Sequence, residues 1–203
     1  MPKVIAITSE KGGVGKSTLA VHLTGALIER GLDAALIDED GRVGSSLRWA
    51  RRREEGLGFP VLDADEVKPK KLAALDAVLI DTEGRPRRKD LRALAERADL
   101  ILIPSGPTML ELEATRELLD FFEDEGAARR VRVVLTRVPP TGQAGEQARE
   151  DLRDDGWTVC NTALRSYTVY QKAAELGALC RDVRDPRAEQ AWDDVLRLSR
   201  EVL

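Results

Sequence analysis

The stretch VIAITSEKGGVGKST, residues 4–18, decides the fold. The apolar run Val4–Thr8 predicts a buried strand and a helical pattern begins at Lys16, so a glycine-rich turn joins the two. Glycine allows the tight turn in which successive backbone N–H groups point at one anion, and the positive end of the helix dipole adds to the attraction. The sequence therefore predicts a phosphate-binding loop, and a nucleoside triphosphate is its natural ligand.

Three side chains at the end of this loop have separate expected roles. We expect Lys16 to reach the β- and γ-phosphates, Ser17 to ligate Mg²⁺, and Thr18 to lie near the α-phosphate. ATP and Mg²⁺ are therefore the expected cofactors. The loop residues predicted to bind the nucleotide are Lys11, Gly12, Gly13, Val14, Gly15, Lys16, Ser17 and Thr18.

Two positions distinguish this loop from common nucleotide-binding patterns. Glu10 stands where the ordinary G-x-x-x-x-G-K-[ST] pattern has its first glycine, so a strict pattern search misses the site. A dinucleotide-binding loop needs a third glycine where Thr18 stands, so that interpretation fails.

Short apolar runs alternate with longer helical patterns along the rest of the chain. This alternation is typical of an α/β fold with a mostly parallel, twisted sheet and helices on both faces. Strands are expected at Val4–Thr8, Ala34–Asp38, Ala77–Asp81, Leu100–Pro104, Val131–Thr136 and, weakly, Trp157–Cys160. Helices are expected at Lys16–Arg30, Ser45–Glu55, Val67–Leu75, Lys89–Ala98, Leu110–Glu125, Gln143–Asp154, Tyr167–Leu176 and Pro186–Leu203.

Length and composition limit the remaining possibilities. The chain has 203 residues, 42% hydrophobic and 33% charged, and a net charge of −4, which fits one globular domain over residues 1–203. Cys160 and Cys180 alone cannot build a disulfide framework, a zinc site or an iron–sulfur cluster. No apolar run approaches the ~20 residues of a membrane-spanning helix, so we expect a cytoplasmic protein. His22 is expected on a helix surface.

Carboxylates lie at the ends of two of the predicted strands. Asp38, Asp40 and Asp81 come at or just after strand ends, and in an open α/β sheet ligands bind at this carboxyl edge. We therefore expect these carboxylates beside the phosphates. Because phosphoryl transfer of this kind relies mainly on positioning and charge, no general base with a shifted pKa is required.

A second lysine marks the loop more specifically. Lys11 begins the stretch KGGVGKS, residues 11–17, which resembles the deviant Walker A motif of the ParA/MinD group of P-loop ATPases. The later sequence is most similar to the small ParA/ParF-like branch. The resemblance implies a homodimer that sandwiches two ATP molecules, with Lys11 reaching across to the nucleotide of the other subunit. Such a lysine stabilises charge on the transferred phosphoryl group only in the closed dimer.

The resemblance also implies roles for residues outside the loop. Asp81 looks like the Walker B aspartate that holds Mg²⁺ through a water, and the resemblance thus implies Ser17, Asp40 and Asp81 around Mg²⁺. Asp38 and Asp40 match the family's two aspartates, and Asp40 helps to orient the attacking water. The segment Leu135–Val138 looks like the strand end near adenine, where Arg137 could flank the base.

Two loops depart from the family's pattern. Gly41-Arg42 replaces its Pro-Gln after the second aspartate, and Thr82-Glu83-Gly84 replaces its x-Pro-Pro after Walker B. Glycine makes both loops more flexible. Glu83 is predicted either to lie near the triphosphate or to face solvent and pair with Arg85 or Arg87.

The resemblance favours an ATP-dependent switch of chromosome or plasmid partition. The closed dimer would bind double-stranded DNA without sequence preference and associate with the nucleoid, and a centromere-binding, ParB-like protein would stimulate slow hydrolysis. Arg165 and the Arg181–Arg187 segment are candidate DNA contacts. Alternatives are a related ATPase that positions protein cargo, an ATP-dependent ligase or kinase of a small molecule, and a binding module with little hydrolysis. A membrane partner is not expected, because the last helix carries Asp193, Asp194 and Glu201.

Overall fold

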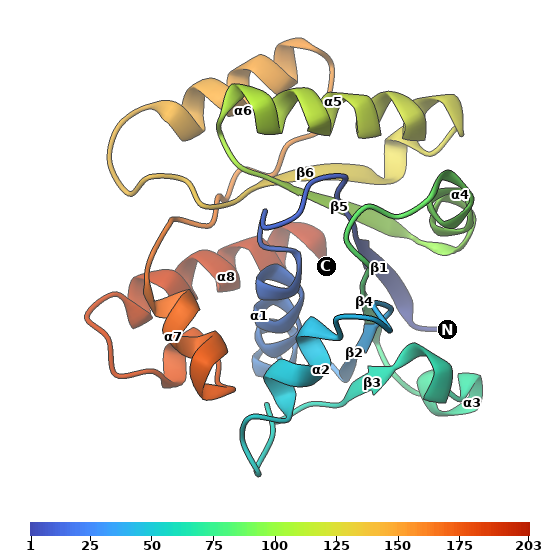
Figure 1. The fold of residues 1–203 in the computed structure, drawn as a ribbon, viewed down its shortest axis with the longest axis vertical. Coiled ribbons are helices and arrows are strands. Elements are labelled where there is room, and N and C mark those ends of the chain that lie inside the picture. The colour runs from blue at the N-terminus through green and yellow to red at the C-terminus, as the bar shows by residue number, and fades with distance from the viewer.

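A six-stranded, all-parallel sheet lies at the centre of the computed structural model, which describes residues 1–203 (Figure 1). The strand order is β3-β2-β4-β1-β5-β6, and every neighbouring pair is parallel. The phosphate loop follows β1, and β2 and β4 end beside it. The strands are β1 (Lys3–Ile7), β2 (Ala34–Asp38), β3 (Val61–Asp63), β4 (Ala77–Asp81), β5 (Leu100–Ser105) and β6 (Val131–Leu135).

Helices cover both faces of the sheet, as predicted. One apolar core joins α1, α2, α7 and α8 to one face, and a second joins α4, α5 and α6 to the other. Figure 1 shows α5 and α6 on the opposite side of the sheet from α1, α7 and α8. The helices are α1 (Lys16–Glu29), α2 (Ser45–Ala50), α3 (Pro69–Leu72), α4 (Arg88–Arg97), α5 (Met109–Asp124), α6 (Ala144–Asp154), α7 (Val169–Leu176) and α8 (Ala188–Val202).

The sequence interpretation was wrong about two strands. It missed β3, a three-residue edge strand whose side chains are only half-buried, so little apolar pattern marks it. The weak strand predicted at Trp157–Cys160 reduces to one isolated bridge between Val159 and Val133. Two hydrogen bonds of 2.9 Å hold that bridge.

Two predicted helices are shorter than expected. The helix predicted at Ser45–Glu55 ends at Ala50, because the following residues 51–55 are charged, exposed and bury nothing against the sheet. The helix predicted at Val67–Leu75 keeps one turn, Pro69–Leu72. Residues 51–55 offer no apolar side chain for packing, and short helices in water depend on such packing for stability. In the second segment Val67, Leu72 and Leu75 do pack against the core, but Pro69 keeps Lys68 extended, so the helix begins only at Pro69.

His22 does not lie on a helix surface. Its side chain is 0% exposed and packs edge-on against Trp49 and Tyr170, at centroid distances of 5.5 and 5.1 Å. The Cys180 N–H donates to Nε2 at 3.0 Å, so Nδ1 carries the proton and donates to Thr18 O at 2.8 Å. His22 therefore joins the helix of the phosphate loop to the C-terminal region.

This burial predicts a pH-dependent contribution to stability. Burial lowers the pKa of His22 from 6.5 to about 4, against the opposing hydrogen bond to Thr18. Because the unfolded chain then binds more protons between these values, the stability that His22 contributes is lost as the pH falls from 6.5 toward 4. Relative to His22→Gln, the wild type should lose about 2 kcal/mol of unfolding free energy between pH 7 and pH 5.

Denaturant titrations of both proteins at several pH values measure this difference. Other groups that titrate in this range, such as Asp81, are present in both proteins. Their contributions therefore cancel in the difference in unfolding free energy between wild type and His22→Gln. Parallel pH profiles for the two proteins would show that His22 is not held neutral by the fold.

Candidate functional site

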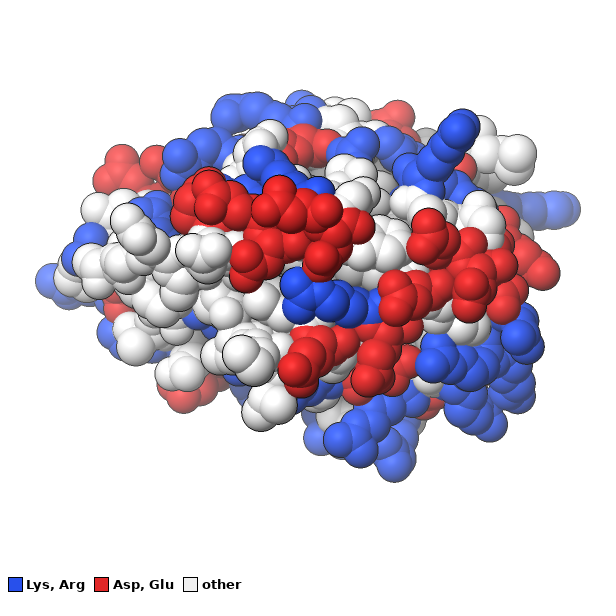
Figure 2. Space-filling model, turned by 90° about the horizontal axis from the view of Figure 1, so that it is seen from above, with Lys and Arg blue, Asp and Glu red and all other residues white.

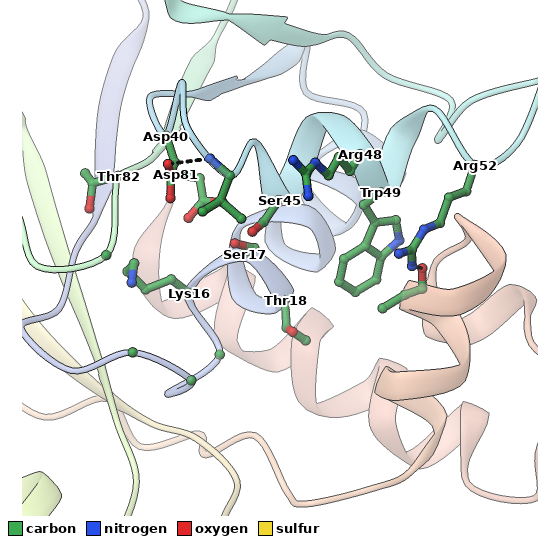
Figure 3. Close-up of a pocket in the computed structure, with 16 residues that line it drawn as sticks. Lys16, Ser17, Thr18, Asp40, Ser45, Arg48, Trp49, Arg52, Asp81 and Thr82 are labelled. Carbon is green, nitrogen blue, oxygen red and sulfur yellow. Dashed lines mark hydrogen bonds between the residues drawn. The ribbon is translucent and has the colours of Figure 1, made fainter.

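A cleft of about 620 Å³ lies where β1, β2 and β4 end at the carboxyl edge of the sheet (Figure 3). The phosphate loop forms one side of the cleft. The loop between β2 and α2, together with α2 itself, forms the other side. The lining residues are Gly12, Gly13, Gly15, Lys16, Ser17, Thr18, Asp40, Val43, Ser45, Arg48, Trp49, Arg52, Asp81, Thr82, Gly84 and Ala174. The cleft therefore brings together the loop residues from Gly12 to Thr18, except Val14, with Asp40 and Asp81.

The loop backbone leaves open space for an anion. Gly13 and Gly15 have φ angles of 77° and 90°, which side chains other than glycine rarely adopt. A Cβ at Gly12, Gly13 or Gly15 would meet no atom within 4 Å, so the protein itself does not fill this cradle. Gly15 directly precedes α1, whose N-terminal end faces the cradle and favours negative charge.

Lys16 points into the cleft from the first residue of α1 (Figure 3). Its Nζ donates to Ser9 Oγ at 3.2 Å, and Ser9 Oγ donates to Lys11 O at 2.9 Å. Burial lowers the pKa of Lys16, while the nearby charges of Asp81 and Asp40 oppose that shift. The ammonium is thus held between the loop and the two carboxylates, where a phosphate oxygen would replace its weak contact with Ser9.

Asp81 is a buried carboxylate with one unused oxygen. Ser46 Oγ donates to Oδ2 at 2.7 Å, whereas Oδ1 is buried without a hydrogen-bond partner. Burial raises the pKa of Asp81 to about 6, helped by Asp38 and opposed by Ser17, Ser46 and Lys16. A buried oxygen without a partner is costly, so this atom fits a water or cation beside Ser17.

Mg²⁺ at this place would need ligands from outside the chain. No cluster of three or more His, Cys, Asp or Glu could hold a metal ion by itself. Mg²⁺ commonly takes one or two protein oxygens and completes its shell with phosphates and water. Ser17, Asp40 and Asp81 around the cleft suit that arrangement, in which the bound ion would neutralise phosphate charge.

Asp38 and Asp40 shape the loop between β2 and α2. Asp38 accepts from the backbone N–H groups of Asp40 and Leu47, both at 3.0 Å, so both its oxygens are engaged within the fold. Asp40 accepts from the N–H groups of Arg42 at 3.2 Å and Val43 at 2.8 Å, and its side chain lines the cleft. Asp38 therefore holds the loop that carries Asp40 to the site.

Lys11 and Arg137 lie outside the main cleft. The Lys11 ammonium makes no hydrogen bond or ion pair, and Lys11 is absent from the cleft lining. Arg137 forms an ion pair with Glu111 and lines a second cavity of about 280 Å³. This second cavity shares Gly13, Gly15 and Thr18 with the cleft. Arg137 therefore lies next to the site, in a cavity that adjoins the phosphate loop.

Glu83 does not line the phosphate cleft. It faces a neighbouring cavity of about 380 Å³ together with Arg87 and Arg97. Neither placement open from the sequence is fully met: Glu83 lies beside Arg87 and is half-buried, but it forms no ion pair with Arg85 or Arg87, and Arg87 is paired with Asp90 instead. The added negative charge is thus turned away from the phosphate cradle.

The sequence analysis missed the wall that α2 and α7 form. The Trp49 indole N–H donates to Ala178 O at 3.0 Å, and Arg52 donates to Ala174 O. Gly177 permits this approach, because a Cβ there would lie 2.8 Å from Arg52 Cβ and 2.9 Å from Trp49 O. Only the position of α2 directly after Asp40 could have indicated that Arg48, Trp49 and Arg52 line the cleft.

Comparison with known families agrees with this geometry. Residues 5–176 match the CobQ/CobB/MinD/ParA nucleotide-binding domain. The chain belongs to the ParA/MinD family of nucleotide-binding proteins. It is accordingly a ParA/MinD-family ATPase, of the positioning or partition type, that takes ATP and Mg²⁺.

Individual relatives extend over nearly the whole chain. The Maintenance of carboxysome distribution protein A of Gloeobacter kilaueensis is 34% identical, covering 99% of this chain and 94% of its own. Protein ParA of Rhizobium radiobacter is 28% identical over 93% of this chain and 89% of its own. The structure of Pyrococcus horikoshii MinD with Mg-ADP superposes with a TM-score of 0.76 at 18% identity, covering 100% and 96% of the two chains. That last likeness supports the fold.

No helix of this ParA/MinD protein is both long and apolar enough to cross a membrane.

Replacing Asp81 should separate stability from metal-dependent binding. Since burial raises the pKa of Asp81 from 3.8 to about 6, its charge costs free energy at pH 7. Asp81→Asn keeps an acceptor for Ser46, so we expect the nucleotide-free protein to gain about 1–3 kcal/mol of unfolding free energy. The same change should weaken Mg²⁺-dependent ATP binding.

Denaturant titration and nucleotide titration with and without Mg²⁺ test both parts. Asp193→Asn, on the exposed side of α8, is the matched control and should change neither quantity. Loss of stability in Asp81→Asn, or Mg²⁺-dependent binding equal to wild type, would contradict this assignment.

Proposed function

We propose that residues 1–203 act as one ATPase domain, in which ATP closes a homodimer that binds DNA without sequence preference and drives DNA partition. Partner-stimulated hydrolysis would reopen the dimer and release it from the nucleoid. The observation that carries the proposal is the position of Lys11. Its ammonium belongs to the phosphate loop, yet it lies outside its own cleft and has no partner within the chain.

The rest of the site supports a shared arrangement. Lys16 occupies the cleft of its own chain, so one cation already serves the β- and γ-phosphates there. A second lysine that reaches the nucleotide of another subunit would add positive charge where the phosphoryl group develops negative charge. In this arrangement hydrolysis requires assembly, which is the property of a switch.

The surface charges limit where DNA could bind. Acidic side chains gather over the face that α5 and α6 form (Figure 2). A polyanion is repelled from that face and would bind elsewhere. The exposed acidic residues on the two helices are Glu113, Glu117, Asp120, Glu123, Asp124, Glu146, Glu150 and Asp154.

The candidate DNA contacts differ in how free their guanidinium groups are. Arg165 is held by Asp194 through two hydrogen bonds of 2.8 and 2.9 Å, and Arg181 is paired with Glu29. Arg184 and Arg187 have no carboxylate partner within 4 Å. We therefore favour Arg184 and Arg187 as phosphate contacts, with affinity that falls steeply as salt rises.

Positioning of a protein cargo is the second candidate. The 34% identity with a carboxysome distribution protein, across 99% of this chain, supports it. The switch and its DNA contacts would be the same in both cases, because only the stimulating partner connects the dimer to its cargo. Stimulation by a protein bound to a DNA site would favour partition, whereas stimulation by a protein bound to a protein assembly would favour positioning.

Lys11→Ala tests the shared site. We expect this variant to bind ATP with near wild-type affinity but to lose ATP-dependent dimerisation, DNA retention and most phosphate release, because only the contact between subunits is removed. Light scattering, DNA retention and phosphate release are measured with ADP, ATP and a non-hydrolysable analogue. Lys70→Ala, an exposed lysine of α3, is the matched control.

Other outcomes identify the alternatives. The proposal fails if ATP changes neither the assembly nor the DNA affinity of the wild type. Turnover that needs a small-molecule acceptor and ignores DNA would indicate a ligase or kinase. Dimerisation and DNA retention without measurable phosphate release would indicate a binding module.

A further inference from the structure

The first turn of α5 contains a buried carboxylate that the site described so far does not use. Glu111 is 5% exposed and forms an ion pair with Arg137. Thr108 Oγ1 donates to its Oε2 at 2.6 Å. A Cβ at Gly106 would overlap the Glu111 carboxyl group, so a glycine is needed there to admit it. Glu111 is thus enclosed by Gly106 on one side, while its two oxygens contact Thr108 and Arg137.

Arg137 is fixed in an unusual backbone conformation. Its φ angle is 54°, in the left-handed region that residues with a Cβ seldom occupy. The neighbours on both sides are anchored: Thr136 Oγ1 donates to Val14 O at 2.7 Å, and the Val138 N–H donates to Leu164 O at 3.2 Å. The backbone therefore aims the Arg137 side chain, and Glu111 holds its end.

The cavity beside Arg137 continues from the phosphate cleft. It has a volume of about 280 Å³ and shares Gly13, Gly15 and Thr18 with the cleft. Tyr170 and Gln171 of α7 form part of its other wall. A nucleotide whose phosphates lie on the loop would place its base on this side, next to the guanidinium.

We propose that Glu111 is a positioning residue that holds Arg137 flat against the base and thereby sets the preference for adenine over guanine. This inference rests on the nucleotide site of the proposed function. A free guanidinium presents two parallel donors that match O6 and N7 of guanine. Glu111 occupies the Nη2 donor of Arg137, so the two-donor fork that guanine needs is incomplete. The planar group then offers its face for stacking, and guanine loses its advantage over adenine.

Helix capping accounts for only part of this arrangement. Thr108 and Glu111 have the spacing of a capping box. In that motif the glutamate accepts from the backbone N–H of the N-cap residue, which is Thr108 here. Here Glu111 accepts from the Thr108 hydroxyl instead, and Thr108 makes no side-chain bond to the helix backbone. The ion pair with Arg137, 26 residues away, lies outside any capping role.

Calorimetric titration with ADP and GDP tests the proposal without hydrolysis. We expect the ADP-to-GDP affinity ratio to fall about tenfold in Glu111→Gln, the effect of one regained guanine contact. Glu111→Asp, which keeps the charge, should restore most of the preference. Thr108→Ala removes the contact within the helix turn and should leave the ratio unchanged.

A double-variant cycle separates positioning from structural damage. Because Glu111 acts through Arg137, Glu111→Gln should have no further effect on the ratio in an Arg137→Ala background. An unchanged ratio in Glu111→Gln, or an equal effect in both backgrounds, would overturn the inference. If the wild type binds ADP but ATP fails to dimerise it, the proposed function fails while this inference stands. Wild type that binds neither nucleotide would overturn both.

Discussion

The structure depends on one electrostatic constraint: a short turn must present several backbone N–H groups to a phosphate without help from side chains. Gly13 and Gly15 satisfy it with positive φ angles, and α1 adds its N-terminal dipole. Parallel pairing of β1 with β4, and of β4 with β2, then brings Asp81 and the loop after Asp38 to the same sheet edge. Every other element of the site is placed relative to this turn.

The helix after the turn also connects the site to the far end of the chain. His22, one turn beyond Thr18, bonds both to Thr18 O and to the N–H of Cys180. Trp49 packs on His22 and donates to Ala178 O, so α2 is joined to the same C-terminal region. Thr18, Trp49 and Ala174 also line the cleft. Movement of the nucleotide-facing loops is thus resisted by a buried aromatic cluster.

The sequence predicted what depends on local pattern and missed what depends on contacts between distant residues. The glycine turn, five of the six strands and the three aspartates follow from local spacing, and the structure confirms the fold that they imply. His22 was misplaced because its neighbours come from residues 49, 170 and 180, which no helical periodicity relates. Glu111 was missed for the same reason, since its importance appears only once β6 brings Arg137 beside it.

The most direct test of the central claim is a crystal structure with Mg²⁺ and a non-hydrolysable ATP analogue. The account predicts two subunits facing each other, with Lys11 Nζ of each within hydrogen-bond distance of the triphosphate bound to the other. A single subunit with a loaded cleft, or a dimer in which Lys11 turns toward its own nucleotide or solvent, would contradict it.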